Sequence, residues 1–310
     1  MARKLGLPLI LVSALLVSSV VWAAEDGTAG STYLDVLAIG VGAAPSAIVA
    51  YTAAPGDLWS LTYNPAGLSN IPRLRLGVSQ IEWFDDTSFS YFGAGMPQGN
   101  GGLAMGLAYF DMGSVPKRNA MGEDAGVADA NNIGFIGGYG FCMPNICDMS
   151  VGVSGHVIQG NLDDETATAI GVNFGVLYAM MEQQFRLGAS VRNLGTTLKF
   201  LEEEDEQTMT FAGGLSYMTL PDQIPNASLM VGVDAIKPKD RDPGFAVGGE
   251  LWLYDMMALR AGYRSGDETV GNLSAGLGFR YSDFQLDYTY TDHKDLNTSH
   301  RISLTMAFGS

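Results

Sequence analysis

The stretch that decides the fold stands near the end of the chain and reads Arg301-Ile302-Ser303-Leu304-Thr305-Met306-Ala307-Phe308. Its large apolar side chains recur at every second position, which is the period of a β-strand and not of a helix. The same period recurs back to about residue 73. Because such strands are typical of bacterial outer-membrane proteins, the sequence predicts an all-β fold, a transmembrane antiparallel β-barrel of about 14 strands.

The first 23 residues predict export through a cleaved signal peptide. Arg3 and Lys4 precede an apolar run, and Val21-Trp22-Ala23 places small residues where a signal peptidase cuts. The alternative is an uncleaved membrane anchor, which Pro8 and the short apolar core disfavour. An exported protein that stays in a membrane without spanning helices must pair its backbone between strands. We therefore expect the outer membrane of a Gram-negative bacterium.

Strand-like segments and their connections support the same fold. The short connections, such as residues 98–100 and 282–283, alternate with long or acidic ones, such as 111–130 and 194–207. Short periplasmic turns and long outer loops produce this alternation, although the turn at 218–226 is longer than expected. The predicted strands are 73–81, 87–97, 101–110, 131–142, 149–159, 168–180, 185–193, 208–217, 227–236, 244–254, 256–264, 273–281, 284–291 and 299–308.

Composition adds two constraints. The chain has 40 glycines in 310 residues, many of them inside the alternating segments, where glycine permits tight bends and close packing at a barrel wall. The formal net charge of −16 disfavours nucleic acid as a partner, because phosphate contacts need a basic face.

Charged residues are expected on the inward face of the later strands. Both signs occur there, so we interpret them as a cross-strand ion network that braces the wall, with an ion-selectivity lining as the alternative. The predicted lumen-facing charges are Arg186, Arg192, Asp234, Glu250, Arg260, Arg264, Arg280, Asp287 and Arg301.

The chain divides into a signal peptide (1–23), an N-terminal hatch or plug in the lumen (24–72) and the barrel (73–310). The middle part carries glycines, prolines and the motif Asn64-Pro65-Ala66-Gly67, and it does not alternate like a membrane strand. Its apolar content favours an ordered plug over a disordered tail.

Other chemistry is weakly indicated. Cys142 and Cys147 flank one predicted turn and form a disulfide in an oxidising compartment, or remain free thiols. No nucleophile-elbow, phosphate-loop or zinc-protease motif occurs, and we expect no metal, no cofactor and no enzyme activity. A hydrolase that uses Ser154 and His156 is the enzyme alternative. The acidic runs 163–165 and 202–206 predict solvated loops, with calcium or lipopolysaccharide bridging as the alternative.

A resemblance covers most of the mature chain. It rests on Leu37-Ala38-Ile39-Gly40-Val41-Gly42-Ala43, on Tyr63-Asn64-Pro65-Ala66-Gly67-Leu68, and on later matches such as Leu259-Arg260-Ala261-Gly262-Tyr263-Arg264 and Leu273-Ser274-Ala275-Gly276-Leu277-Gly278-Phe279-Arg280. In this order they resemble the PorV/PorQ family of outer-membrane proteins, which is similar to the FadL-type fatty-acid transporters. Residues 46–51 and 54–57 depart from the family's glycine-rich hatch pattern.

The resemblance implies two functions for a fourteen-stranded barrel with a hatch. One is the passage of hydrophobic small molecules across the outer membrane, with a ligand leaving the lumen sideways through the wall. The other is the docking and handing-on of cargo proteins in type IX secretion. A purely structural barrel and a soluble periplasmic β-protein are lesser alternatives. The expected partners are membrane lipid, a hydrophobic ligand or secreted cargo, and the barrel-assembly machinery that reads a C-terminal strand ending at Phe308.

Overall fold

The structure is a computed structural model that describes residues 40–82, 87–118, 121–122, 124–144, 146–163, 165–200, 203–220, 224–266, 272–293 and 298–309. The predicted signal peptide lies outside these residues. No helix in the described part of the chain is both long and apolar enough to span a membrane.

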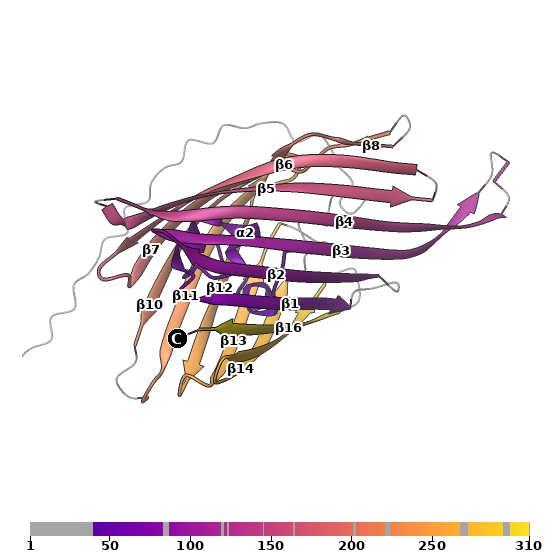
Figure 1. The fold of residues 1–310 in the computed structure, drawn as a ribbon. Coiled ribbons are helices and arrows are strands. Elements are labelled where there is room, and N and C mark those ends of the chain that lie inside the picture. Colours follow the sequence, from indigo (N-terminus) through magenta and orange to yellow (C-terminus); the bar gives the residue numbers. More distant parts are fainter. Residues whose placement is uncertain are drawn as a thin grey trace, which may run out of the picture.

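Fourteen antiparallel strands close into a barrel, in which each strand pairs with its neighbours in the chain (Figure 1). The last strand returns to the first, from the pair Leu74 and Phe308 to the pair Glu82 and His300, so no edge is left unpaired. The predicted fold class is confirmed. The strands are β1 Leu74–Glu82, β2 Ser88–Gln98, β3 Gly101–Arg118, β4 Asp124–Met143, β5 Ile146–Leu162, β6 Glu165–Met180, β7 Phe185–Gly195, β10 Thr210–Thr219, β11 Ser228–Pro238, β12 Gly244–Leu253, β13 Met257–Arg264, β14 Leu273–Tyr281, β15 Phe284–Asp292 and β16 Ser299–Phe308.

The two faces of the wall differ as the alternation predicts. On β14, Leu277 and Phe279 are 57% and 48% exposed, whereas the intervening inward residues are covered, and Ser274 is 1% exposed. On β15, Leu286 is 49% exposed and Asp287 is fully buried. An apolar outer band around a more polar interior is typical of barrels that sit in lipid.

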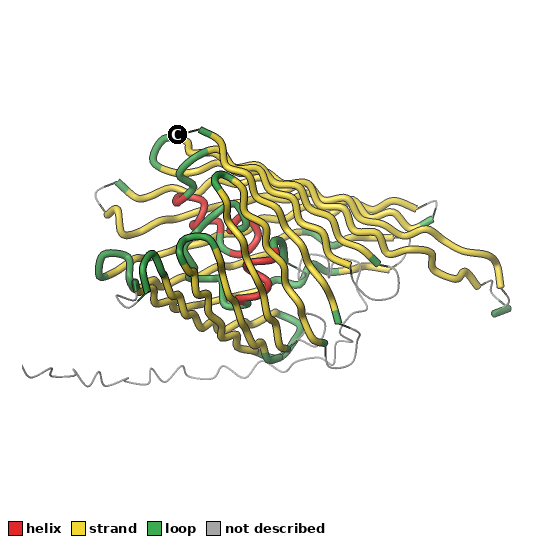
Figure 2. Tube along the Cα trace, turned by 90° about the horizontal axis from the view of Figure 1, so that it is seen from below, coloured by secondary structure: helices red, strands yellow, loops and turns green. Residues whose placement is uncertain are grey.

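Residues 40–72, here called the inner segment, lie inside the barrel (Figure 2). They form α1 Ala43–Ile48, α2 Ser60–Tyr63 and the 3₁₀-helix η2 Pro65–Asn70. Trp59, Leu61 and Leu68 are buried in one apolar cluster with Phe89 and Tyr91 of the wall. Residues 24–39 lie outside the described part, so the bounds of the predicted hatch and its ability to open stay predictions.

Glycines on the inward face let the inner segment approach the wall closely. A methyl group at Gly152 would overlap the backbone of Pro65, and one at Gly188 would overlap the carbonyl of Thr52. The inner face of β12 shows the same contact, between Gly248 and the carbonyl of Ile48. Glycine is required at such positions because any side chain would displace one backbone from the other.

Two parts of the barrel differ from the prediction. Strands β3 and β4 continue as a paired hairpin through most of the predicted loop 111–130 and project beyond their neighbours (Figure 1). The predicted loop 194–207 contains a second small sheet, β8 Leu198–Phe200 with β9 Glu203–Asp205. A hairpin outside a bilayer does not need an apolar face. The alternation of apolar and polar residues therefore does not predict the extended β3–β4 hairpin or the β8–β9 sheet.

Candidate functional site

An apolar cavity, here called the inner pocket, lies between the inner segment and the strands β2 to β7. Val41 and Thr62 of the inner segment line it on one side. The barrel wall contributes the apolar side chains of Phe89, Tyr91, Phe110, Ile136 and Ile158, together with the polar side chains of Asn132, His156, Asn173 and Asn193. The enclosed space is about 60 Å³, room for a few water molecules, so a larger guest enters only if the lining side chains shift.

Gln207, which precedes β10, reaches the polar side of the inner pocket. Its Nε2 donates to the carbonyl oxygens of Ile170 and Thr196, at 2.9 and 2.8 Å, and its Oε1 lies 2.7 Å from Nε2 of His156. Gly171 and Gly195 leave room for this side chain. A methyl group at Gly171 would stand 2.7 Å from Gln207 Oε1, and one at Gly195 would stand 2.6 Å from Gln207 Nε2. A single side chain from the connection between β9 and β10 therefore joins Ile170 of β6, Thr196 after β7 and His156 of β5.

The pairing of β6 with β7 is interrupted beside the inner pocket. Val172 pairs with Leu194, but the next pair is Phe174 with Val191, so β7 carries one extra residue. This is a β-bulge, and Asn193 within it has a φ of 59°. Side chains replace the missing ladder bonds, since Asn173 Oδ1 accepts from the backbone N–H of Asn193 at 2.7 Å.

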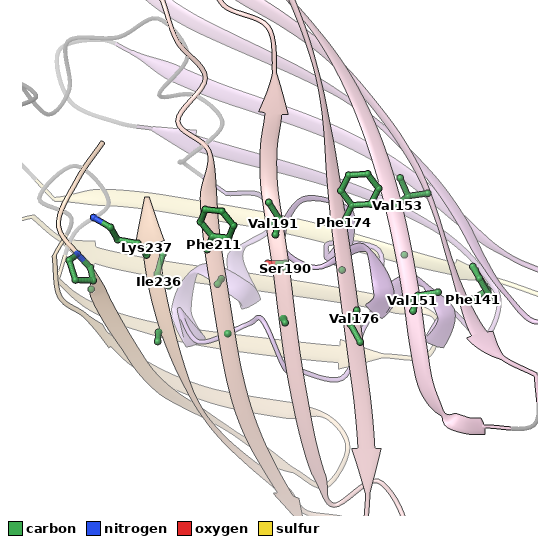
Figure 3. A pocket seen from close by; sticks show the side chains of 18 residues that line it. Phe141, Val151, Val153, Phe174, Val176, Ser190, Val191, Phe211, Ile236 and Lys237 are labelled. Carbon is green, nitrogen blue, oxygen red and sulfur yellow. The ribbon is translucent and has the colours of Figure 1, made fainter. Parts of the chain in front are cut away.

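A large apolar depression lies on the outer face of the same wall (Figure 3). Its volume is about 760 Å³, and its lining includes Val153, Phe174, Val176, Val191 and Phe211. Phe174 and Val191 are the pair at which the ladder resumes after the bulge. The inner pocket and this outer depression therefore lie on opposite sides of one interruption in the wall.

The motif Asn64-Pro65-Ala66-Gly67 is buried where the inner segment meets β3 to β6. Asn64 caps η2 by accepting from the N–H of Ala66 at 3.1 Å. Its Nδ2 donates to the carbonyls of Thr52 and Val176, at 2.7 and 3.1 Å. The motif thus joins two parts of the inner segment to β6.

Among the predicted lumen charges, one cross-strand ion cluster forms. Arg260 of β13 lies 2.6 Å from Glu250 on the adjacent β12 and 2.8 Å from Asp287 on β15, two strands away. The guanidinium of Arg280 stacks 3.9 Å from the ring centre of Trp252 beside this cluster. Buried charges in such a cluster stabilise one another only as a set.

Other predicted lumen charges bind the inner segment instead. Asp234 accepts from the N–H of Thr52 at 2.8 Å, Arg264 donates to the carbonyl of Val49 at 3.4 Å, and Arg301 donates to the carbonyl of Gly40 at 3.0 Å. Arg186 bonds Gln183 at the turn before β7, and Arg192 directly precedes the bulged Asn193. The interpretation as a wall brace therefore accounts for only part of the set.

The remaining predicted sites are not assembled or lie beyond the described side chains. Ser154 donates to the carbonyl of Leu61 and accepts from Asn173, while His156 bonds Gln207, so the two are not coupled as nucleophile and base. The side chain of Cys147 and most of the acidic runs lie outside the described part, so the disulfide and the calcium alternative stay predictions.

Sequence reasoning missed Gln207, Asn173 and Asn193. Asn173 occupies an inward strand position, where an amide is unremarkable, and Gln207 sits in a loop after an acidic run. No local sequence pattern predicts that these residues lie close together, because the bulge depends on how two strands pair.

Solved structures with the same fold are transport channels. The Ralstonia pickettii toluene transporter TbuX matches with a TM-score of 0.62 at 13% identity, over 87% of this chain and 99% of its own. The CymD monoaromatic hydrocarbon channel matches with a TM-score of 0.62 at 11% identity, over 90% and 100%. This chain shares their fold.

The Pseudomonas putida toluene transporter TodX matches similarly, with a TM-score of 0.58 at 13% identity over 87% of this chain and 98% of that one. No family model matches the chain, and no curated protein matches it. At these identities the likeness concerns the fold alone.

Proposed function

We propose that this protein is an outer-membrane channel of the PorV/PorQ, FadL-like kind, which binds hydrophobic small molecules and passes them across the outer membrane. The closed barrel with an apolar outer face, the hydrocarbon channels that share its fold and the resemblance of its motifs support this proposal. It includes export by the signal peptide, insertion by the barrel-assembly machinery that reads the strand ending at Phe308, and no chemical turnover.

The observation that carries the proposal is the pair of apolar cavities on either side of the β6–β7 bulge. A ligand would enter the inner pocket from outside the cell, where the inner segment blocks the way straight through the lumen. It would then pass sideways between Asn173 and Asn193 into the outer depression and the bilayer. In this state Asn173 bonds the N–H of Asn193, and Gln207 joins Ile170 of β6 to Thr196 after β7, so passage requires these contacts to open.

Deleting Asn193 tests this route, because it removes the extra residue and allows β6 and β7 to pair without interruption. We expect uptake of labelled toluene by cells that express the variant to fall to the level of cells without the protein. Deleting Gly113 is the matched control, since it lies in another register shift, between Asp111 and Ser114 of β3. Uptake that survives loss of Asn193 in a correctly folded barrel would contradict the lateral route.

The second candidate is cargo docking in type IX secretion, and the projecting β3–β4 hairpin favours it. The register of β2 with β3 ends at Asp111, and that of β4 with β5 ends at Ala130, so the tip of the hairpin pairs only with itself. Removing residues 114–128 would abolish surface attachment of exported proteins if the hairpin docks cargo, and would leave toluene uptake unchanged. Transport alone predicts that neither changes.

A further inference from the structure

Two buried polar atoms that face the inner pocket have no hydrogen-bond partner. They are Nδ1 of His156 and the hydroxyl oxygen of Tyr91, in side chains whose residues are 5% and 3% exposed. Both residues line the pocket, beside Phe89, Phe110 and Ile136. Buried polar groups are nearly always paired, so a ligand in this pocket that bonds one of these atoms gains a partner that the protein does not supply.

Gln207 determines which hydrogen-bonding role His156 offers. The Nε2 of Gln207 faces two carbonyl oxygens, which accept only, so the amide nitrogen must stand there and Oε1 must face His156. Oε1 can only accept, so Nε2 of His156 carries the proton of the bond between them. In the neutral imidazole, Nδ1 is then an acceptor. Its lone pair can accept a hydrogen bond from an O–H or N–H group of a ligand.

Tyr91 supplies the complementary group across the pocket. Its hydroxyl lies against Gly106, where a methyl group would overlap it. Gly106 pairs with Ile136, and Ile136 pairs with His156, so the Tyr91 hydroxyl sits over the same cross-strand row, two strands from the imidazole. Two strand spacings are roughly 10 Å, which is the span of a single substituted ring with its contacts.

We propose that the inner pocket recognises an uncharged, mostly apolar ring that carries a hydroxyl group, as in a phenol. The ligand hydroxyl donates to Nδ1 of His156, and the Tyr91 hydroxyl, two strands away, contacts the opposite edge of the ring. A carboxylate has no proton to donate to Nδ1 of His156, and a hydrocarbon leaves that nitrogen unpaired. This inference rests on the proposed function and names its ligand class.

The space of about 60 Å³ limits the ligand to a small molecule, and a ring enters only if the lining side chains shift. Three probes with the same methylated ring therefore separate the possibilities: p-cresol, toluene and p-toluate. We expect the purified barrel, by calorimetry at pH 7, to bind p-cresol about tenfold more tightly than toluene, the effect of one buried hydrogen bond, and p-toluate most weakly.

The variant His156→Phe removes the acceptor and keeps a ring of similar size. It should reduce the preference for p-cresol over toluene to about onefold, whereas Tyr91→Phe should leave that preference in place. The control is His300→Phe, since His300 lies exposed on the outer face and bonds Tyr288.

Heat-modifiable gel mobility shows whether each variant is folded. If His156→Phe does not fold, the ratio of the wild-type affinities for p-cresol and toluene decides the question. A wild-type protein that binds p-cresol and toluene equally, or a preference for p-cresol that survives in His156→Phe, overturns this inference and leaves the channel in place. A wild-type protein that binds no probe overturns the proposed function itself.

Discussion

At Gly175 the backbone of the barrel wall lies against the side chain of Asn64 of the inner segment, with no room for a side chain between them. A methyl group there would overlap the Asn64 side-chain oxygen, which caps η2. By contrast, a methyl group at Gly213, on the outward face of β10, would meet nothing within 4 Å. A glycine on the inward face therefore cannot be replaced without an overlap, whereas a glycine on the outward face can.

We predict that Gly175→Ala lowers the free energy of unfolding by about 1–3 kcal/mol, because the inner segment must shift to relieve the overlap. Gly213→Ala should change it by less than about 0.5 kcal/mol. Urea titrations of both variants in detergent check this. Equal effects would show that the inner segment does not rest on the wall as described.

Asp57 of the inner segment is the residue from which a pH effect is expected. Burial raises the pKa of its carboxyl group to about 6, against the opposing influence of Arg75 and of hydrogen bonds from Tyr51 and the N–H of Trp59. A carboxyl whose pKa is raised on folding favours the folded state when protonated. The stabilisation is complete below the unfolded pKa of about 4 and is lost as the pH rises through about 6.

We therefore predict that the inner segment is held more tightly at pH 4 than at pH 7.5, by at most about 3 kcal/mol because the side chain is not wholly shielded from water. Limited proteolysis within residues 50–60 across this range measures the effect. Asp57→Asn retains an acceptor for the Trp59 N–H and should show no pH dependence over this window. A slope that persists in this variant would assign the effect to another group.

Among the elements, β16 joins the end of the chain to its first strand, because it pairs with β1 on one side and β15 on the other. Without it, both neighbours would present unpaired edges to the bilayer, where each unsatisfied backbone group costs several kcal/mol. At the bulge in β7, by contrast, the backbone pairing is already interrupted, and the side chains of Asn173 and Asn193 supply hydrogen bonds in place of the ladder.

Removal of residues 299–310 should therefore prevent closure altogether. We expect the truncated chain to lose the faster gel migration of unheated samples and the resistance to protease that a closed barrel shows. A deletion of residues 114–128 is the comparison, because the hairpin tip lies beyond the barrel register. A truncated chain that still migrates as a compact barrel would show that β1 and β15 can pair directly.

For the whole molecule, the barrel and the inner segment form one packed body. Thr289 and Ser303 of the last strands bond the backbone of Ala43, while Asn64 and Pro65 meet the wall at β5 and β6. The inner segment thus contacts both halves of the barrel. The bulge between β6 and β7 lies beside a cavity on each face, where the proposed lateral path would cross the wall.

The sequence by itself determined the barrel, its fourteen strands and the direction in which most side chains point. Those properties follow from the alternation of apolar and polar residues within each strand, as on β14 and β15. They also follow from the need to pair every backbone group in lipid. Only the tertiary structure decided where the wall is interrupted, which glycines touch the inner segment, and that Gln207 meets His156. These features depend on the register between strands and on contacts between residues far apart in the chain, which no local pattern records.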